Sequence, residues 1–219
     1  MSVEWPLLTN LTADERNAFL GIARRRVFER GDIVFHRHDP ADALHLIRRG
    51  RFAVRIVTPL GYTATLATLV GGETFGELAL LGERRRTASV VALERGETLC
   101  VHQPAFAALC RRHPTVTDAL ARALGARIDQ LSAQLVEALY VPAERRVLRR
   151  VADLATAYRA GDGVVEVPLT QEEVGGLAGA ARGTVNRVLK DAEARGEVRV
   201  RRGGVLVLDQ DAIRRRGGL

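Results

Sequence analysis

The chain has 219 residues, a hydrophobic fraction of 47% and a formal net charge of +7, which excludes a disordered chain and allows one large core or two modest ones. No apolar run approaches the roughly 18 residues of a membrane helix, and the N-terminus has no basic segment followed by an apolar one. We therefore expect a cytoplasmic protein with no membrane partner. The positive charge favours a polyanionic partner, although a codon bias toward arginine would raise it too.

The N-terminal part of the chain predicts one helix followed by many strands. Residues 7–24 predict a short amphipathic helix capped by Thr12 and Glu15. From Arg26 to about Gln103 the apolar residues alternate with a period of two, in short runs separated by glycine and Asp-Pro turns. Many short strands at this spacing predict a β-sandwich or jelly roll.

The histidines and cysteines of this region do not predict a metal site. His36 and His38 would share one strand face close to His45, but no carboxylate or cysteine pattern completes a set of ligands. Cys100 and Cys110 belong to no CxxC or Cys/His set and are expected to be small buried hydrophobic residues. We expect no bound metal.

The segment from Gly71 to Ala92, GGETFGELALLGERRRTASVVA, combines the parts of an anion site. Glycine allows main-chain N–H groups to approach an anion closely. Arginine binds phosphate oxygens with two parallel hydrogen bonds. A sugar hydroxyl beside that phosphate would need a carboxylate acceptor, and Glu77 is placed to be one.

This segment resembles the phosphate-binding cassette of cyclic-nucleotide-binding domains, whose pattern is F-G-E-x-A/G-L followed by R-[ST]-A. The resemblance implies that Glu77 accepts the ribose 2′-hydroxyl and that Arg86 pairs with the cyclic phosphate. The implied ligand-binding residues are Phe75, Gly76, Glu77, Leu78, Arg86, Thr87 and Ala88. The alternative is a tight turn held by a structural Glu77–Arg86 salt bridge.

After Pro104 the apolar pattern becomes helical. Residues 105–112 predict a short helix, and a long helix is predicted from about Thr115 to Leu139. Its apolar positions alternate four and three apart, which is typical of a coiled-coil seam and favours a parallel homodimer over packing on its own β domain. The positions of this seam are Thr117, Ala121, Leu124, Ile128, Leu131, Leu135 and Ala138. Tyr140-Val141-Pro142 then breaks the helix.

The C-terminal part predicts a helix over 143–159, a strand over 164–168 and then a helix–turn–helix. Thr170 and Glu173 form a capping box, the first helix ends within Gly176–Gly179, and a second helix runs from Arg182 to about Arg195. This spacing is that of a DNA-reading unit. Residues 198–208 predict a β-hairpin, which would make the unit winged.

Residues 169–189 resemble the helix-turn-helix of the cyclic-AMP receptor protein / fumarate–nitrate regulator (CRP/FNR) superfamily of transcription factors. The resemblance implies double-stranded DNA as the partner and guanine contacts by Arg182 and Arg187. The DNA-binding residues are expected to be Thr170, Gln171, Arg182, Thr184, Asn186, Arg187, Lys190, Arg201 and Arg202. The chain departs from the family pattern at Gly183, where a Glu is usual, and at Ala181, where a capping Ser is usual, so the operator sequence is not carried over.

The resemblance implies an effector held partly by the long helix. Members that respond to cyclic AMP hold the adenine amino group with hydroxyl residues on that helix, and the nearest match here is Asp129-Gln130. Cyclic AMP is the leading ligand, another nucleotide or no ligand being the alternatives. RNA polymerase is expected as a further partner if the protein activates transcription.

Together these features predict an α+β protein in three parts. Residues 1–114 would form a cyclic-nucleotide-binding β jelly roll, residues 115–140 a dimerisation helix, and residues 141–219 a winged helix-turn-helix. No Ser/His/Asp set, metal triad or P-loop is present in the sequence. We therefore expect a regulator and not an enzyme.

Overall fold

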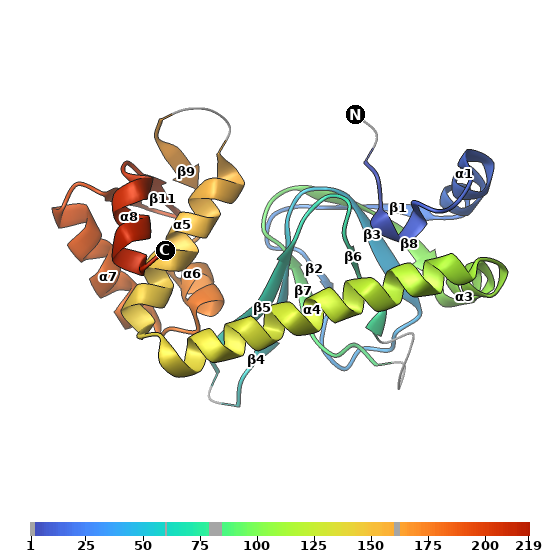
Figure 1. The fold of residues 1–219 in the computed structure, drawn as a ribbon, viewed down its shortest axis with the longest axis horizontal. Coiled ribbons are helices and arrows are strands. Elements are labelled where there is room, and N and C mark those ends of the chain that lie inside the picture. Colours follow the sequence, from blue (N-terminus) through green and yellow to red (C-terminus); the bar gives the residue numbers. More distant parts are fainter. Residues whose placement is uncertain (1–2, 60, 79–84, 160–162) are drawn as a thin grey trace. The chain divides into compact units, whose positions relative to one another are not determined.

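The computed structural model describes residues 3–59, 61–78, 85–159 and 163–219 (Figure 1). Residue contacts divide the chain into two compact units, one formed by residues 1–56 and 66–130 and the other by residues 57–65 and 131–219. Several predicted features lie wholly or partly outside the described residues: the turns at Pro59-Leu60-Gly61, Gly82-Glu83 and Gly161-Asp162-Gly163, and the apolar segment 78–81. None of the described helices has the length and apolar character needed to cross a membrane.

The described residues of the first unit form two four-stranded sheets, to which residues 63–65 of the second unit contribute the start of β5. One has the order β1-β8-β3-β6 and the other the order β2-β7-β4-β5. Their bounds are β1 Arg24–Phe28, β2 Ile33–Phe35, β3 Ala43–Arg49, β4 Phe52–Val57, β5 Thr63–Leu69, β6 Thr74–Phe75, β7 Ser89–Ala92 and β8 Gly96–His102. A core that draws Phe28, Ile47, Phe52, Phe75 and Val90 from both sheets fills the space between them. The predicted jelly roll is confirmed.

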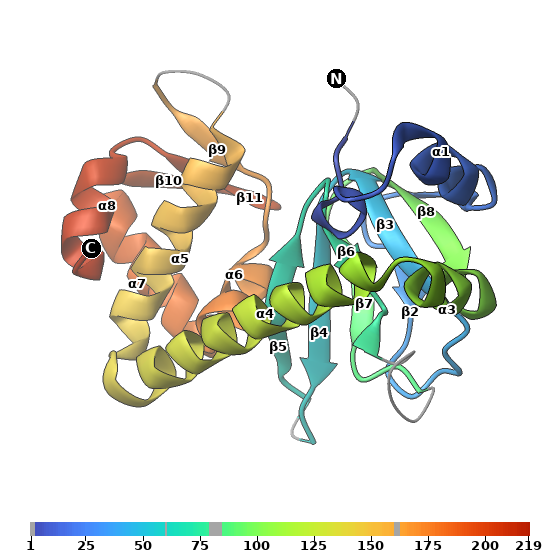
Figure 2. The ribbon, with the colours of Figure 1, turned by 45° about the vertical axis from the view of Figure 1, so that its right-hand side comes forward.

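Helices cover the outer face of one sheet. Successive side chains on a strand point to opposite sides, so β3 directs Leu44 and Leu46 outward and Ile47 into the roll. The outward residues pack against η1 (Pro6–Leu8), α1 (Ala13–Gly21), α3 (Gln103–Arg112) and the start of α4 (Pro114–Tyr140). Figure 2 shows α1 and α3 beside β3 and β8. Trp5 is buried there and donates its indole N–H to the Ile47 carbonyl at 3.0 Å.

The bounds of the predicted N-terminal helix are wrong. The helix spans Ala13–Gly21 instead of residues 7–24, although the Thr12–Glu15 capping box is present. After it, the apolar side chains of Ile22, Val27 and Ile33 are exposed. Ile33 and Val27 lie on β2 and β1, which are the edge strands of their sheets, so these strands have less covered surface than central ones.

The long helix α4 changes its surroundings along its length. Near its start, Val116 and Leu120 are buried against the helices of the first unit. Farther along, its large apolar side chains are exposed: Ile128, Leu131, Leu135, Val136 and Leu139. The predicted helix is confirmed to within one residue at each end.

The second unit is mainly helical. Its elements beyond α4 are α5 Ala143–Tyr158, β9 Val165–Val167, α6 Gln171–Ala178, α7 Arg182–Ala194, β10 Val198–Arg201, β11 Gly204–Val207 and α8 Gln210–Gly217. The strands form a sheet in the order β10-β11-β9, and the hairpin pairs Val198 with Val207 and Arg201 with Gly204. The predicted winged helix-turn-helix is therefore present. The sequence did not predict α8, which begins at an Asp209 side-chain cap.

Candidate functional site

The cassette begins at Phe75, the last residue of β6, and Gly76 follows that strand directly. Gly76 has φ 89°, a left-handed conformation that residues with a Cβ rarely adopt. A Cβ added there would lie 2.5 Å from Arg86 Nη1 and 3.2 Å from the Ala43 carbonyl oxygen. Glycine is therefore required both by the backbone conformation and by the close approach of Arg86.

Arg86 is a buried cation with donor capacity left over. Its side chain is 4% exposed, its Nη1 donates to the Gly76 carbonyl at 3.1 Å, and its guanidinium lies 4.0 Å from the centre of the Phe35 ring. The nearest carboxylate, that of Asp42, is 3.8 Å from Nη2. Its Nε is buried and has no hydrogen-bond partner. Because arginine stays charged in proteins, this position is suited to an anion.

Glu77 is a half-buried residue whose carboxylate lacks a full set of partners. Its Oε2 has no hydrogen-bond partner. Burial raises the pKa of Glu77, and the positive charges of Arg127 and Arg86 oppose that shift. Since Arg86 turns to Gly76 and Phe35, the alternative of a structural Glu77–Arg86 salt bridge is not what this part of the structure shows. Glu77 instead presents an acceptor such as a sugar hydroxyl would need.

The other predicted cassette residues differ in exposure. Phe75 is buried and stacks on His45, with ring centres 4.9 Å apart. Ala88 is also buried, while Leu78 and Thr87 are exposed. Among the described cassette residues, Phe75 and Ala88 therefore provide buried apolar surface close in sequence to the charged pair Glu77 and Arg86.

On α4 the residue whose charge reaches the cassette is Arg127. The predicted adenine contacts, Asp129 and Gln130, are exposed two and three positions later. A signal for Arg127 exists in the sequence, because it follows Leu120 by seven residues and so shares the helix face that Leu120 directs into the first unit.

A cavity of about 200 Å³ is lined in part by Arg86, and Glu77 is not among its lining residues. Its lining includes Arg24, Arg26, Asp42, His45 and Cys100. Burial, followed by the charges of Arg86 and Arg26, lowers the pKa of His45 to about 3, so its imidazole is neutral. Among the described residues, no group of three or more His, Cys, Asp or Glu side chains could hold a metal ion.

The helix-turn-helix is built as its sequence indicates. Thr170 and Glu173 form the capping box of α6, and Gly179 ends that helix in a left-handed conformation with φ 57°. Ala181 precedes α7 without a side-chain cap. Val185 and Leu189 lie on the buried face of α7. Its outer face is therefore free for other contacts.

The predicted DNA-binding residues gather around α7 and the hairpin. Arg182, Arg187 and Lys190 are exposed on α7, and Arg201 and Arg202 are exposed at the turn of the hairpin. Arg182 and Lys190 begin and end two turns of the helix, so they offer positive charge along its length. An exposed basic helix beside a basic turn suits the grooves and phosphates of DNA.

Thr170, Gln171, Thr184 and Asn186 surround the start of α7. Asn186 donates to the Gln171 side chain at 3.1 Å, and both residues are half-buried. Arg187 donates to Glu144 of α5 at 2.7 Å. The exposed face of α7, which carries Arg187, is called the reading face here. The sequence did not predict Glu144 as a neighbour of this face, because 43 residues separate it from Arg187.

Comparison with known proteins finds a domain family for each of the two regions. Residues 25–113 match the cyclic nucleotide-binding domain family, and residues 145–216 match the Crp-like helix-turn-helix domain family. The cyclic AMP receptor protein of Thermus thermophilus is 34% identical over 202 residues, which is 92% of each chain. The chain belongs to the CRP/FNR family of transcription regulators.

Further known proteins are similar over most of the chain. A CRP-like cAMP-activated global transcriptional regulator of Mycobacterium tuberculosis is 29% identical over 86% of each chain. The structure of the Thermus thermophilus catabolite activator protein is 32% identical, with a TM-score of 0.55, and covers 97% of this chain and 98% of its own. The c-di-GMP responsive regulator CLP of Xanthomonas campestris is 21% identical with a TM-score of 0.79, covering 90% and 99%, and so shares the fold.

As a CRP/FNR regulator the chain binds DNA and is not an enzyme. Its two departures from the family pattern, Ala181 and Gly183, are both exposed at the start of α7. A Cβ at Gly183 would meet nothing within 4 Å, so glycine is not required there by packing. The departure therefore changes what the reading face can contact and leaves the fold as it is.

Proposed function

We propose that the protein is a dimeric, sequence-specific transcription regulator whose DNA affinity is controlled by a cyclic nucleotide, with cyclic AMP as the first candidate. Residues 1–114 would bind the nucleotide, residues 115–140 would form the dimer, and residues 141–219 would bind DNA. As a regulator of transcription it would act in the cytoplasm, with RNA polymerase as a further partner if it activates.

The observation that carries nucleotide binding is the pair of buried, unsatisfied polar atoms, Glu77 Oε2 and Arg86 Nε. Buried polar groups are nearly always hydrogen-bonded, because leaving them unpaired costs about 1–3 kcal/mol each. A cyclic nucleotide supplies the missing partners, since its ribose hydroxyl would donate to Glu77 and its phosphate would accept from Arg86. Arg127 adds a second positive charge that acts on Glu77.

Cyclic AMP is the first candidate because of the relatives. Those that match over most of the chain include a cyclic AMP receptor protein and a cAMP-activated regulator. The base contacts are proposed to come from α4, with Asp129 and Gln130 as the sequence-based candidates beside Arg127. A different effector, or none, is the alternative that the experiment below separates.

The exposed apolar side chains of α4 support the dimer. Ile128, Leu131 and Leu135 are positions of the heptad seam and are exposed. Such a stripe is costly in water and is covered when two copies pair along it. Pairing would hold two recognition helices about 34 Å apart, the spacing of successive major grooves. Nucleotide binding would then bias the arrangement of the two winged helix-turn-helix units, called the reading units below.

Calorimetric titration of the purified protein with cyclic AMP and with cyclic GMP tests the proposal, with Arg86→Ala as the variant and Arg85→Ala as its matched control. Arg85 is the adjacent arginine and donates to the His38 carbonyl. We expect cyclic AMP to bind, Arg86→Ala to weaken binding at least about 100-fold by removing a charge-assisted pair, and Arg85→Ala to bind as the unmodified protein does. DNA affinity with and without the nucleotide then tests control.

No heat and no thermal stabilisation with either nucleotide would contradict cyclic-nucleotide control and leave a regulator with another effector or none. Equal losses in Arg86→Ala and Arg85→Ala would mean that binding does not use the cassette. Sedimentation of the same samples measures the dimer.

A further inference from the structure

Two helices of the second unit end close to the first turn of α5. The last carbonyl groups of a helix have no donor within the helix and carry partial negative charge. At the end of α4 these include the carbonyls of Ala138 and Val141, and at the end of α6 they include those of Ala178 and Gly179. These carbonyl groups require donors from elsewhere.

Arg146 of α5 supplies donors to both ends at once. Its Nε donates to Ala178 O at 2.9 Å and its Nη2 to Gly179 O at 2.9 Å. Its Nη1 donates to Val141 O at 2.7 Å and to Ala138 O at 3.3 Å. One guanidinium therefore joins the end of the long helix to the end of the first helix of the reading unit.

The contact lies next to the start of the recognition helix. Only Ala180 and Ala181 separate Gly179 from Arg182, where α7 begins. The amide of Ala180 donates to Gly175 O, and the amide of Thr184 donates to Ala181 O. Because this turn is short and internally bonded, holding the carbonyls of Ala178 and Gly179 also holds the direction in which α7 leaves the turn.

We propose that Arg146 is a positioning residue that couples the end of α4 to recognition helix α7 and thereby sets the orientation in which the reading unit meets DNA. The side chain of Arg146 donates to main-chain carbonyls, and its proposed role does not include a contact with DNA. A change in the direction of α4 would be passed to the turn through these four bonds. The coupling depends on DNA binding by the family fold and does not require that cyclic AMP be the effector.

Only the planar guanidinium group of an arginine can reach the carbonyls of both helix ends at once. A guanidinium has five N–H donors in one plane, so its three nitrogens can reach carbonyls on two sides. A lysine ammonium is a single point with three donors and cannot span the two helix ends. Arg146→Lys keeps the charge and removes the span, which separates orientation from charge.

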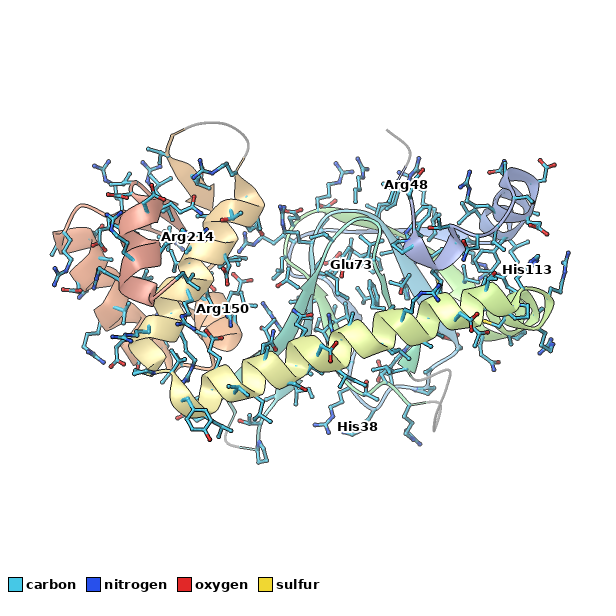
Figure 3. The ribbon with its side chains drawn as sticks, in the orientation of Figure 1. His38, Arg48, Glu73, His113, Arg150 and Arg214 are labelled. Atoms are coloured by element: carbon cyan, nitrogen blue, oxygen red, sulfur yellow. The ribbon has the colours of Figure 1, made fainter. Side chains whose placement is uncertain are left out.

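Arg149 provides a matched control on the same helix. Its Nε donates to Gly217 O at 2.7 Å and its Nη2 to Gly218 O at 3.2 Å, at the end of α8. Its Nη1 donates to Glu137 at 3.2 Å. Neighbouring Arg150, labelled in Figure 3, pairs with Glu137 and Asp153. Arg149 thus binds helix-end carbonyls as Arg146 does, without contacting the turn before α7.

The experiment compares full-length Arg146→Ala, Arg146→Lys and Arg149→Ala. Each binds a DNA duplex selected from a random pool by the unmodified protein and, separately, a duplex of unrelated sequence. Affinity is measured by fluorescence anisotropy below every melting temperature, with and without cyclic AMP. We expect Arg146→Ala to lose at least about tenfold in its preference for the selected duplex, Arg146→Lys to resemble it, and Arg149→Ala to keep the preference despite a lower melting temperature.

The ratio of the affinities for the selected and the unrelated duplex distinguishes positioning from stability. A variant that is less stable but fully folded in the assay should bind each duplex as tightly as before. A ratio unchanged in Arg146→Ala, or lowered equally in Arg149→Ala, overturns the proposal. Should Arg146→Ala show no cooperative melting, Arg146→Lys decides, and an undiminished preference in that variant overturns it. If the unmodified protein does not bind cyclic AMP, that result contradicts the proposed effector and leaves the proposal about Arg146 to be decided by the DNA affinities.

Discussion

Glu77 and Glu97 are carboxylates of the first unit with buried oxygen atoms, but their surroundings are opposite. Glu97 has a side chain that is 3% exposed, and it accepts from Arg48 at 2.9 Å and from Arg25 at 2.8 Å, with Arg49 at 3.3 Å. Hydrogen bonding from Arg25 leads the causes that lower the pKa of Glu97 to about 2. Burial raises the pKa of Glu77, which has an oxygen without a partner. Figure 3 labels Arg48 at the Glu97 cluster.

The difference separates framework from site. A buried charge with a full set of partners holds strands together, because any rearrangement would leave it unpaired. A buried charge without them raises the free energy of the folded chain and lowers that of a complex. Glu97 ties β8 to β1 and β3, whereas Glu77 and Arg86 keep open positions for a ligand.

The sharpest test of this comparison is Glu77→Gln. We expect it to weaken nucleotide binding by about tenfold to 100-fold, because the amide lacks the charge that strengthens the bond to the ribose hydroxyl. The same variant without ligand should melt at a higher temperature at neutral pH, since the folded state no longer contains a carboxylate whose ionisation burial opposes.

The sign of the stability effect follows from the raised pKa. Glu77 favours the folded state fully below its ordinary pKa of 4.5 and loses that contribution as pH rises through its folded-state value. The advantage of Glu77→Gln should therefore vanish in acid. Glu73→Gln is the matched control, because Glu73 lies just before β6, as Glu77 lies just after it, and its carboxylate accepts from the Val70 amide. A lower melting temperature for Glu77→Gln at neutral pH would show that Glu77 is part of the framework.

Glu97→Gln should have the opposite effect on stability. The amide cannot accept charge-assisted bonds from three arginines, so we expect the melting temperature to fall by about 4 °C. Nucleotide affinity, measured by calorimetry below that temperature, should not change. A stable variant that loses nucleotide binding would contradict the assignment of Glu97 to the framework.

The pH dependence gives a second measure of Glu97. Because its folded-state pKa is depressed, its contribution is complete above the ordinary value of 4.5 and is lost as pH falls toward about 2. The unmodified protein should therefore lose stability in that window, and Glu97→Gln should lose less. Chemical denaturation at a series of acidic pH values measures the two slopes.

The smallest expected effect concerns Glu144, the carboxylate beside the reading face. Hydrogen bonding from Arg187 lowers the pKa of Glu144, so in the free protein at neutral pH an ionised Glu144 holds the arginine that DNA would have to take from it. We expect Glu144→Gln to bind DNA about two- to threefold more tightly, the range of an exposed ion pair. Asp153→Asn removes an acid of α5 that pairs with Arg150 instead and should leave DNA affinity unchanged. Weaker binding by Glu144→Gln would mean that the pair orients Arg187 for DNA.

Local signals predicted the elements of the fold well. The capping boxes at Thr12 and Thr170, the period of two in the roll and the heptads of α4 all have a short-range cause, and each is present in the structure. The helix α8 was not predicted: its local signal is a single cap at Asp209, and its contacts with α5, such as the bonds of Arg149, join residues far apart in the sequence.

The cassette was predicted as a set of residues but not as an arrangement. Sequence spacing placed Glu77 and Arg86 together and favoured neither a mutual salt bridge nor a ligand by itself. Only the folded chain shows that Arg86 turns to Gly76 and Phe35. The contributions of Arg127, Glu144 and Arg146 come from helices distant in sequence, so they depend on packing.

The burial of Trp5 has a practical consequence. It is the single tryptophan of the chain, and it is 6% exposed within the first unit, bonded to Ile47. Tryptophan emission is therefore an intrinsic optical reporter of the unit that contains the cassette. Far-ultraviolet circular dichroism records the helices of both units. Recorded together on one unlabelled sample, the two signals would distinguish melting of the cassette unit from melting of the DNA-reading unit.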